Sequence, residues 1–350
     1  AGTLRRIADG GAEEFYRGGT AREIARSFRE AGGLLDEEAL ASHQPELYEP
    51  LAANYRGYTV LENRPPSQGM ILLEMLNILE GFDLASMGHL STQNIHLMVE
   101  AKKLAFADRN AYMGDPRVES VPLDELLSKE HAAKRRALID PRRASNLVPA
   151  AEPYPGNTDT SYFCVADKEG NAVSFIHSLY NFFGSAFVAE GTGIVFNSRQ
   201  RGFRLQEGHP NTIAPGKRPM HTLNAFTVMK HGKPFLVGGT PGVDFQVQGN
   251  AQVITGIIDH GLGPQQVVDS PRWASHPGSD PDSLDAPYAL QLEPRMPLEV
   301  ARGLGEMGHR IMWGQQGLSH GIVQLIQIDQ GTGVKTGASD PRGDGHAAAV

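Results

Sequence analysis

Two β-rich runs separated by a short polar turn are the feature that most constrains what this chain can fold into. Residues 161–166 and 172–178 are rich in aromatic and β-branched side chains, and residues 167–171 between them read Asp-Lys-Glu-Gly-Asn. A polar, glycine-containing turn between two such runs predicts a β-hairpin. Residues 156–160, Gly-Asn-Thr-Asp-Thr, have the small, polar composition of a surface loop. The hydroxyl of Thr160 is therefore expected where a loop enters a strand.

A threonine at this point is suited to one kind of catalysis. If the bond between Asp159 and Thr160 were cut, Thr160 would carry a nucleophilic hydroxyl and a free α-amine, and the amine could act as its general base. The simpler interpretation is a β-branched residue that opens a strand, which is the commoner role of an isolated threonine. Taken alone, the residues around Thr160 leave both interpretations open.

A series of motifs extends this pattern along nearly the whole chain. They occupy residues 160–174, 191–194, 215–219, 239–242 and 337–342, and further upstream residues 55–58, 65–69, 76–80 and 107–109. Together they resemble the γ-glutamyltranspeptidases and related acylases, which are N-terminal-nucleophile hydrolases. The resemblance implies an α+β fold, a four-layer αββα sandwich, and a precursor that cleaves itself immediately before Thr160. Residues 1–159 would then be the later, mostly helical part of a large subunit, ending in a processing linker, and residues 160–350 the small subunit.

The resemblance also assigns a catalytic group. Thr160 stands at the position of the nucleophile, and Ser178 stands where the family has a threonine whose hydroxyl bonds to it. Gly242 and Val243 stand where two successive glycines donate backbone N–H groups to the oxyanion, so that valine replaces the second glycine. On its own, the glycine-rich run 238–242 between a strand and a helix could present free N–H groups, or could simply be a turn without a ligand.

The substrate-binding positions depart from the family pattern. Arg199 stands where a glutamine helps to hold the α-amino group of a γ-glutamyl donor, and Gly202 replaces the partner aspartate. Tyr180 replaces a substrate-binding asparagine. His221 and Thr222 replace a pair of serines, and Arg201 lies in the same segment as Arg199.

These replacements change the charge that the pocket would accept. A guanidinium group can only donate hydrogen bonds, and it repels an amine while attracting a carboxylate. We therefore expect an acyl group that is an anion without the α-amine, such as an oxamate-like or dicarboxylic monoamide. The alternative is that Arg199 points into solvent, as surface arginines usually do.

Composition excludes several other classes of protein. The formal net charge of −8 over 350 residues argues against a nucleic-acid partner, and no apolar run approaches the roughly 20 residues of a membrane span. Cys164 is the only cysteine, which excludes an internal disulfide, and its strand position predicts a core residue. The 13 histidines show no ligand motif, so neither a metal nor another cofactor is expected.

The expected partner is a small-molecule amide. The resemblance implies that the family's large subunit begins before Ala1, so any targeting region would lie outside this chain. The sequence therefore leaves the cellular compartment open, and the cytoplasm is the favoured expectation.

Helices are expected to dominate the first half and strands the second. We predict short helices within residues 1–46, with Thr20 opening a capping box, and strands between residues 47 and 62. Ser67 is expected to cap a helix after Pro65-Pro66, and Ser91 a longer one that stops before Gly114. In the second half, helices are expected at residues 243–260, 264–269 and 298–307, and strands at 188–196, 222–229, 235–237, 288–292 and 322–328.

Three functional hypotheses remain. The first is a self-processing threonine amidohydrolase that hydrolyses, or also transfers, an acyl group. The second is a catalytically inactive fragment or scaffold of the same family, and the third is a true γ-glutamyltransferase or glutathione hydrolase. Cleavage between Asp159 and Thr160 distinguishes the first from the second, and the response to a substrate α-amine distinguishes the first from the third.

Overall fold

The computed structural model describes residues 1–145, 158–278, 287–314 and 321–349. These residues form two compact units, Ala1–Glu49 with Leu179–Arg199, and Pro50–Ser178 with Gln200–Val350. None of the helices in the described residues is both long and apolar enough to cross a membrane.

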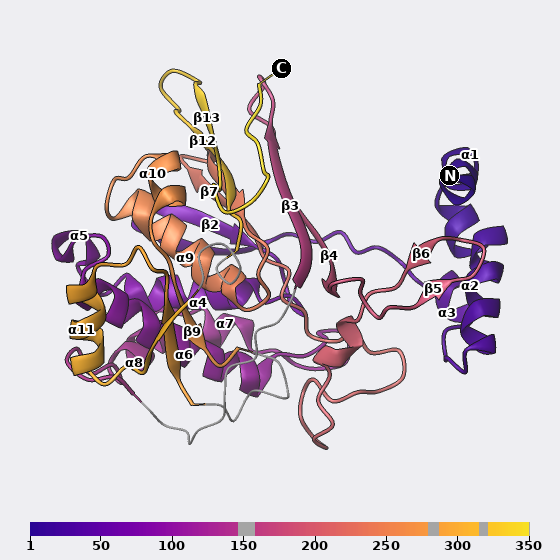
Figure 1. Ribbon diagram of the computed structural model, residues 1–350, viewed down its shortest axis with the longest axis horizontal. Coiled ribbons are helices and arrows are strands. Elements are labelled where there is room, and N and C mark those ends of the chain that lie inside the picture. Colours follow the sequence, from indigo (N-terminus) through magenta and orange to yellow (C-terminus); the bar gives the residue numbers. More distant parts are fainter. Residues whose placement is uncertain (146–157, 279–286, 315–320, 350) are drawn as a thin grey trace. The chain divides into compact units, whose positions relative to one another are not determined.

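The first unit is a small helical cluster closed by a short hairpin (Figure 1). Helices α1 (Gly2–Tyr16), α2 (Gly19–Glu30) and α3 (Glu37–Ala41) confirm the helical prediction for residues 1–46. Strands β5 (Val188–Ala189) and β6 (Ile194–Val195) pair antiparallel, and β5 packs against α2. The buried side chain of Ile24 and the edge-to-face rings of Phe28, Phe187 and Phe196 form the core.

The predicted capping box at Thr20 is wrong. The N-cap of helix α2 is Gly18, two residues before the predicted one, and Thr20 lies within the helix, fully buried. The carboxylate of Glu14, from the preceding helix, accepts hydrogen bonds from the N–H groups of Gly19 and Thr20 and from the Thr20 hydroxyl. A carboxylate from a neighbouring helix therefore satisfies the first N–H groups of α2, which a local sequence pattern does not reveal.

The second unit is built on a six-stranded sheet in the order β1-β2-β7-β8-β12-β13. Every neighbouring pair is antiparallel. The strands are β1 (Leu51–Tyr55), β2 (Tyr58–Glu62), β7 (Ala225–Lys230), β8 (Lys233–Gly239), β12 (Gln324–Ile328) and β13 (Lys335–Ser339). Two of them precede residue 159 and four follow it. After a backbone cut at residue 159, the two fragments would therefore share this sheet and remain paired within it.

The predicted hairpin is confirmed. Strands β3 (Thr158–Ala166) and β4 (Ala172–Asn181) pair as a two-stranded sheet, and the N–H of Asp167 donates to the carbonyl of Asn171 across the turn. Strand β3 packs against β8 and β12 of the large sheet. Cys164 is half-buried and not a core residue, and burial raises the pKa of its thiol to about 11.

Helix α4 (Gly69–Leu79) is buried along its whole length. It packs against β1, β2 and the helices α6 (Thr92–Tyr112), α8 (Lys129–Arg136) and α9 (Phe245–Ile258). Ser91 caps α6 as predicted, because its side chain accepts a hydrogen bond from the N–H of Asn94. The predicted cap by Ser67 is wrong, since α4 begins at Gly69 and the Ser67 hydroxyl donates to the carbonyl of Leu223.

Shorter elements complete the second unit. They are α5 (Leu84–Met87), α7 (Leu123–Leu126), α10 (Pro264–Asp269), α11 (Leu298–Glu306), and the three-stranded sheet of β9 (Trp273–His276), β10 (Ala289–Leu292) and β11 (Ile311–Trp313). The 3₁₀ turn Arg199–Gly202 spans the boundary between the units.

The motif at residues 337–342 supplies a buried charge network. The guanidinium of Arg342 contacts both carboxylate oxygens of Glu293, at 2.5 and 2.6 Å, and Asp340 at 3.0 Å. Asp340 also pairs with Arg272 at 2.6 Å, and all four side chains are at most 3% exposed. Such a network stabilises the fold only while each charge keeps its partners.

We expect Glu293→Gln to lower the free energy of unfolding by about 3–5 kcal/mol, because the buried guanidinium groups of Arg272 and Arg342 would then share the single charge of Asp340. Urea unfolding followed by circular dichroism measures the change. The matched control is Glu306→Gln, whose ion pair with Arg302 is more than 70% exposed on both sides. The control should change stability by less than about 0.5 kcal/mol, and equal effects of the two substitutions would contradict this interpretation of the network.

Candidate active site

The hairpin brings two hydroxyl groups together. Thr160 lies on β3 and Ser178 on β4, and their side-chain oxygens are 2.8 Å apart. Both residues are partly buried. In the uncut chain the nitrogen of Thr160 is an amide, whose delocalised lone pair makes it a poor base. The hydrogen bond to Ser178 therefore orients the Thr160 hydroxyl, and only cleavage after Asp159 would add a basic amine.

An open pocket of about 460 Å³ adjoins Thr160. Residues 160–164 of β3 line it on one side, and Pro241 after the end of β8 also lines it. Strands β12 and β13 supply further lining residues. The pocket is completed by the C-terminal segment, through Asp344, Gly345, His346, Ala347 and Ala348. Thr160 and Pro241 thus line the same pocket, whereas Ser178, Gly242 and Val243 are not among its lining residues.

The turn between β8 and α9 has an unusual backbone. Gly242 has a φ of 128° and Val243 a φ of 50°. Positive φ is accessible to glycine, whereas for a β-branched residue it is a true outlier. Helix α9 begins at Phe245, two residues later than predicted, because the chain is not helical at Val243.

The two N–H groups of this turn are available for a ligand. Within the part of the chain that the structure describes, neither Gly242 nor Val243 donates its N–H in a hydrogen bond. Both residues are partly exposed. The buried Thr240, two residues before Gly242, anchors the turn, because its hydroxyl oxygen accepts a hydrogen bond from the N–H of Ile322. Two adjacent free N–H groups at the start of a helix can bind an oxyanion.

His221 and Thr222 lie beside the start of helix α4. The N–H of His221 donates to the carbonyl of Pro66, and the carbonyl of Thr222 accepts from Nε2 of Gln68 at 2.8 Å. The same Nε2 donates to the carbonyl of Val243 at 3.0 Å. Gln68 therefore links the 221–222 segment to the glycine turn, a connection that the sequence analysis missed.

The remaining predicted substrate-binding residues fall into different parts of the structure. Tyr180 and Arg199 belong to the first unit, where the guanidinium of Arg199 stacks 3.8 Å from the centre of the Tyr180 ring. Tyr180 is buried, and Arg199 is partly exposed. The stacking covers one face of the Arg199 guanidinium, and both the substrate-binding role and the solvent-facing alternative stay predictions. Arg201 belongs to the second unit and is exposed.

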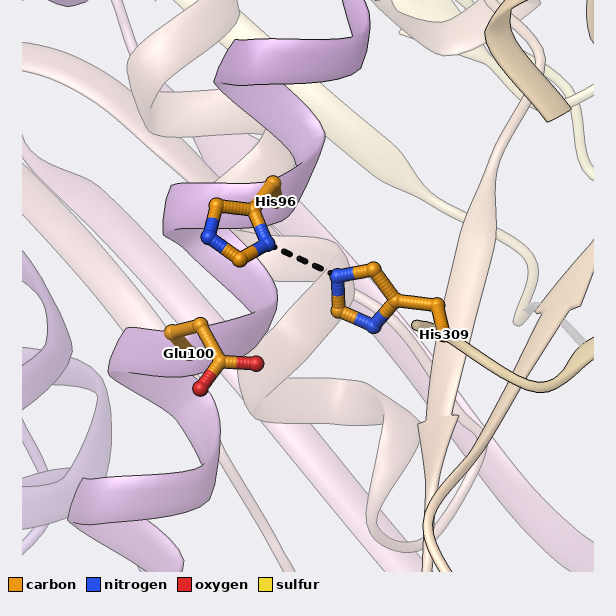
Figure 2. Close-up of side chains that lie close together, drawn as sticks. All are labelled: His96, Glu100 and His309. Carbon is orange, nitrogen blue, oxygen red and sulfur yellow. Dashed lines mark hydrogen bonds between the residues drawn. The ribbon is translucent and has the colours of Figure 1, made fainter. Parts of the chain in front are cut away.

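Three buried side chains, His96, Glu100 and His309, form a group of potential metal ligands (Figure 2). His96 and Glu100 lie one turn apart on α6, and His309 precedes β11. Nε2 of His96 is 2.8 Å from the carbonyl of Asp140, which can only accept, so Nε2 carries the proton. Nδ1 of His96 then accepts from Nε2 of His309, also at 2.8 Å.

The carboxylate of Glu100 is engaged as well. It accepts from the ammonium group of Lys103 at 2.6 Å and from the N–H of Ser145 at 3.1 Å. The ammonium group of Lys103 would repel a divalent cation. Burial lowers the pKa of His309 to about 3, with further contributions from Lys103 and His96. We interpret the group as a hydrogen-bonded pair of histidines beside the Glu100–Lys103 ion pair.

A second group of this kind consists of Glu74, Asp108 and His131. Arg135 neutralises Asp108 through a double contact, and Nε2 of His131 lies 2.8 Å from the same carboxylate. The neighbouring acids, Glu74 first, raise the pKa of His131, while burial raises the pKa of Glu74 to about 8. Glu74 is then protonated at neutral pH and Asp108 is paired with Arg135, which argues for a structural role.

A solved structure shares this fold. The crystal structure of a cephalosporin acylase from Bacillus halodurans matches 99% of this chain with a TM-score of 0.89 and 38% identity, and the match covers 61% of the acylase chain. The α+β class predicted from the sequence is thereby confirmed, with helices and antiparallel sheets arranged as in that acylase.

Sequence comparison gives the family. The γ-glutamyltranspeptidase family model matches residues 1–350, and the chain belongs to that family. It is 37% identical over 352 residues to the glutathione hydrolase-like YwrD proenzyme of Bacillus subtilis (strain 168), which covers 100% of this chain and 65% of the relative. It is 35% identical over 355 residues to the oxamate amidohydrolase proenzyme of Klebsiella pneumoniae, covering 99% of this chain and 64% of that relative. The chain therefore spans slightly less than two thirds of the length of these relatives.

The low pKa of His309 predicts how the free energy of unfolding depends on pH. The pKa of His309 is about 3 in the folded protein, against an ordinary value of 6.5, so below pH 6.5 only the unfolded state binds this proton. The free energy of unfolding should then fall by about 1.4 kcal/mol per pH unit from this group alone. In His309→Gln this contribution is absent, so the stability difference between wild type and variant should shrink as the pH falls from 7 to 5. Urea unfolding at several pH values measures it.

Zinc provides the control for this interpretation. Adding zinc ions at neutral pH should leave the urea midpoint of the wild-type protein unchanged, because each ligand atom already has a partner. A midpoint that rose with zinc in the wild type but not in His309→Gln would identify a metal site instead.

Proposed function

We propose that this chain is the catalytic part of a self-processing amidohydrolase that acts through Thr160. The observation that carries the proposal is the hydrogen-bonded hydroxyl pair of Thr160 and Ser178, with Thr160 lining a pocket that Pro241, the residue before the two free N–H groups of Gly242 and Val243, also lines. The similarity to relatives named as proenzymes supports a maturation step. Residues 1–159 and 160–350 would become the two subunits.

The proposed maturation breaks one peptide bond. The Thr160 hydroxyl, oriented by Ser178, attacks the carbonyl carbon of Asp159, and the amide nitrogen leaves as the α-amine of Thr160. Water then hydrolyses the resulting ester, which frees the Thr160 hydroxyl. After this step one residue carries both the nucleophile and its base.

The proposed hydrolysis uses the same residues. The α-amine of Thr160 takes the hydroxyl proton as the oxygen attacks the substrate amide, and the N–H groups of Gly242 and Val243 stabilise the oxyanion. The leaving amine receives the proton from the Thr160 ammonium group, which leaves an acyl ester on Thr160. Water hydrolyses the ester, and an acceptor amine in its place would give transfer.

The finer architecture is part of this proposal. We expect the β3–β4 hairpin and the six-stranded sheet to contribute the two central layers of a four-layer αββα sandwich. The packing of β3 against β8 and β12 supports this arrangement.

The proposed substrate is an amide whose acyl group carries a carboxylate and lacks an α-amine. Arg199, held by its stacking on Tyr180, can bind a carboxylate through two parallel hydrogen bonds. The similarity to an oxamate amidohydrolase supports an acyl group of this kind. No cofactor is required, because the proposed nucleophile, base and oxyanion donors all belong to the chain.

Intact-mass analysis tests the maturation step. We expect the wild-type protein to divide between Asp159 and Thr160, and Thr160→Ala to stay whole because it lacks the attacking oxygen. Ser178→Ala should divide at least roughly tenfold more slowly, because the hydroxyl loses its orienting partner. The control Thr332→Ala removes a hydroxyl from an exposed turn and should divide like the wild type. A wild-type chain that never divides would favour an inactive scaffold.

A panel of amides with and without an α-amine tests the substrate. The wild type should hydrolyse oxamate-like amides faster than γ-glutamyl-p-nitroanilide. Arg199→Gln should shift that preference toward the γ-glutamyl substrate by roughly 10- to 100-fold, through loss of the carboxylate contact. The exposed Arg302→Gln is the matched control. A wild type that prefers the γ-glutamyl substrate would instead identify a γ-glutamyltransferase or glutathione hydrolase.

A further inference from the structure

Val243 occupies a backbone conformation that its side chain disfavours. Its φ of 50° lies in the left-handed region, where branching at Cβ is costly. Such residues persist only when the surrounding structure holds them in place, and they concentrate at functional sites. The contacts around Val243 should therefore show what holds the turn.

The carbonyl group of Val243 is held by a buried glutamine. Gln68 is fully buried, and its Nε2 donates to the carbonyls of Val243 and Thr222. Its Oε1 accepts from Arg109 at 2.9 Å. These partners fix the orientation of the amide, since the two carbonyls can only accept and the guanidinium can only donate.

Arg109 also binds the next residue of the turn, Asp244. Its side chain is fully buried, and the same Nη1 that binds Gln68 donates to the carboxylate of Asp244 at 2.6 Å. The guanidinium group also stacks on Phe106, 3.8 Å from the ring centre. Two buried residues from the first 159 therefore fix two consecutive residues of the turn, the carbonyl of Val243 and the side chain of Asp244.

We infer that Gln68, fixed by Arg109, is a positioning residue that keeps the N–H groups of Gly242 and Val243 aimed at the developing oxyanion despite the strained valine. This inference rests on the proposed function. Gln68 does not touch the reacting atoms; it holds the carbonyl of Val243 while the N–H stays free. A glycine at residue 243 would adopt the same φ without strain, so it would need this hold much less.

A double-mutant cycle between Gln68→Met and Val243→Gly tests the inference. Methionine is close to glutamine in size but cannot donate to either carbonyl. Gln68→Met should lower kcat for amide hydrolysis by roughly 10- to 100-fold and change KM by less than about twofold, because the oxyanion donors act in the transition state. In the Val243→Gly background the same substitution should cost at least about fivefold less, since the two residues are coupled.

Two outcomes would contradict the inference. Equal losses in the two backgrounds, or a change confined to KM, would show that Gln68 is only a structural residue. The control is Gln93→Met, which removes a single bond to the carbonyl of Pro141 and should combine additively with Val243→Gly. If Gln68→Met does not fold, Gln68→Asn, which is too short to reach both carbonyls, replaces it with the same two outcomes.

Urea midpoints of the four proteins separate this inference from the proposed function. A wild type that neither divides nor hydrolyses amides would reject the proposed function. The cycle is then decided by stability: a smaller midpoint loss from Gln68→Met in the Val243→Gly background supports the hold on the turn, and additive losses overturn it.

Discussion

Helix α4 has no solvent-facing side, and the second unit is arranged around that constraint. All eleven of its residues are buried, so strands and helices must cover it on every side. The residues that flank its two ends make hydrogen bonds to neighbouring loops. Before the first turn, Gln68 binds the carbonyls of Thr222 and Val243, and after the last turn, Glu80 accepts from the N–H of Arg56. A buried helix thereby fixes loops that are distant from it in the sequence.

Local features of the fold could be predicted from the sequence because their signals are local. The turn at residues 167–171 specifies the β3–β4 hairpin, and Ser91 caps α6 through a neighbour three residues away. The caps at Thr20 and Ser67 were predicted from the same kind of pattern and were wrong. In both cases a tertiary contact, from Glu14 to the start of α2 and from Ser67 to Leu223, outweighs the local preference.

The candidate site likewise contains contacts that the sequence predicts and contacts that it does not. The pairing of Thr160 with Ser178 follows once the hairpin is predicted, because the two residues lie on adjacent strands. The bond from Gln68 to Val243 joins residues 175 positions apart, and His96 meets His309 across 213 positions. No periodicity or motif connects such residues. The positive φ of Val243 is also invisible in the sequence, which predicts the first residue of a helix at that position.

The shared six-stranded sheet has a consequence for a chain cut at residue 159. Strand β2 would belong to one fragment and β7 to the other, joined by their backbone ladder and by the packing of α4. Severing the backbone would break no hydrogen bond of that ladder, so the fragments would stay together as a tight heterodimer. Reassembly after denaturation would, however, become a bimolecular event that slows on dilution, and the mature protein would recover poorly from unfolding that its precursor survives.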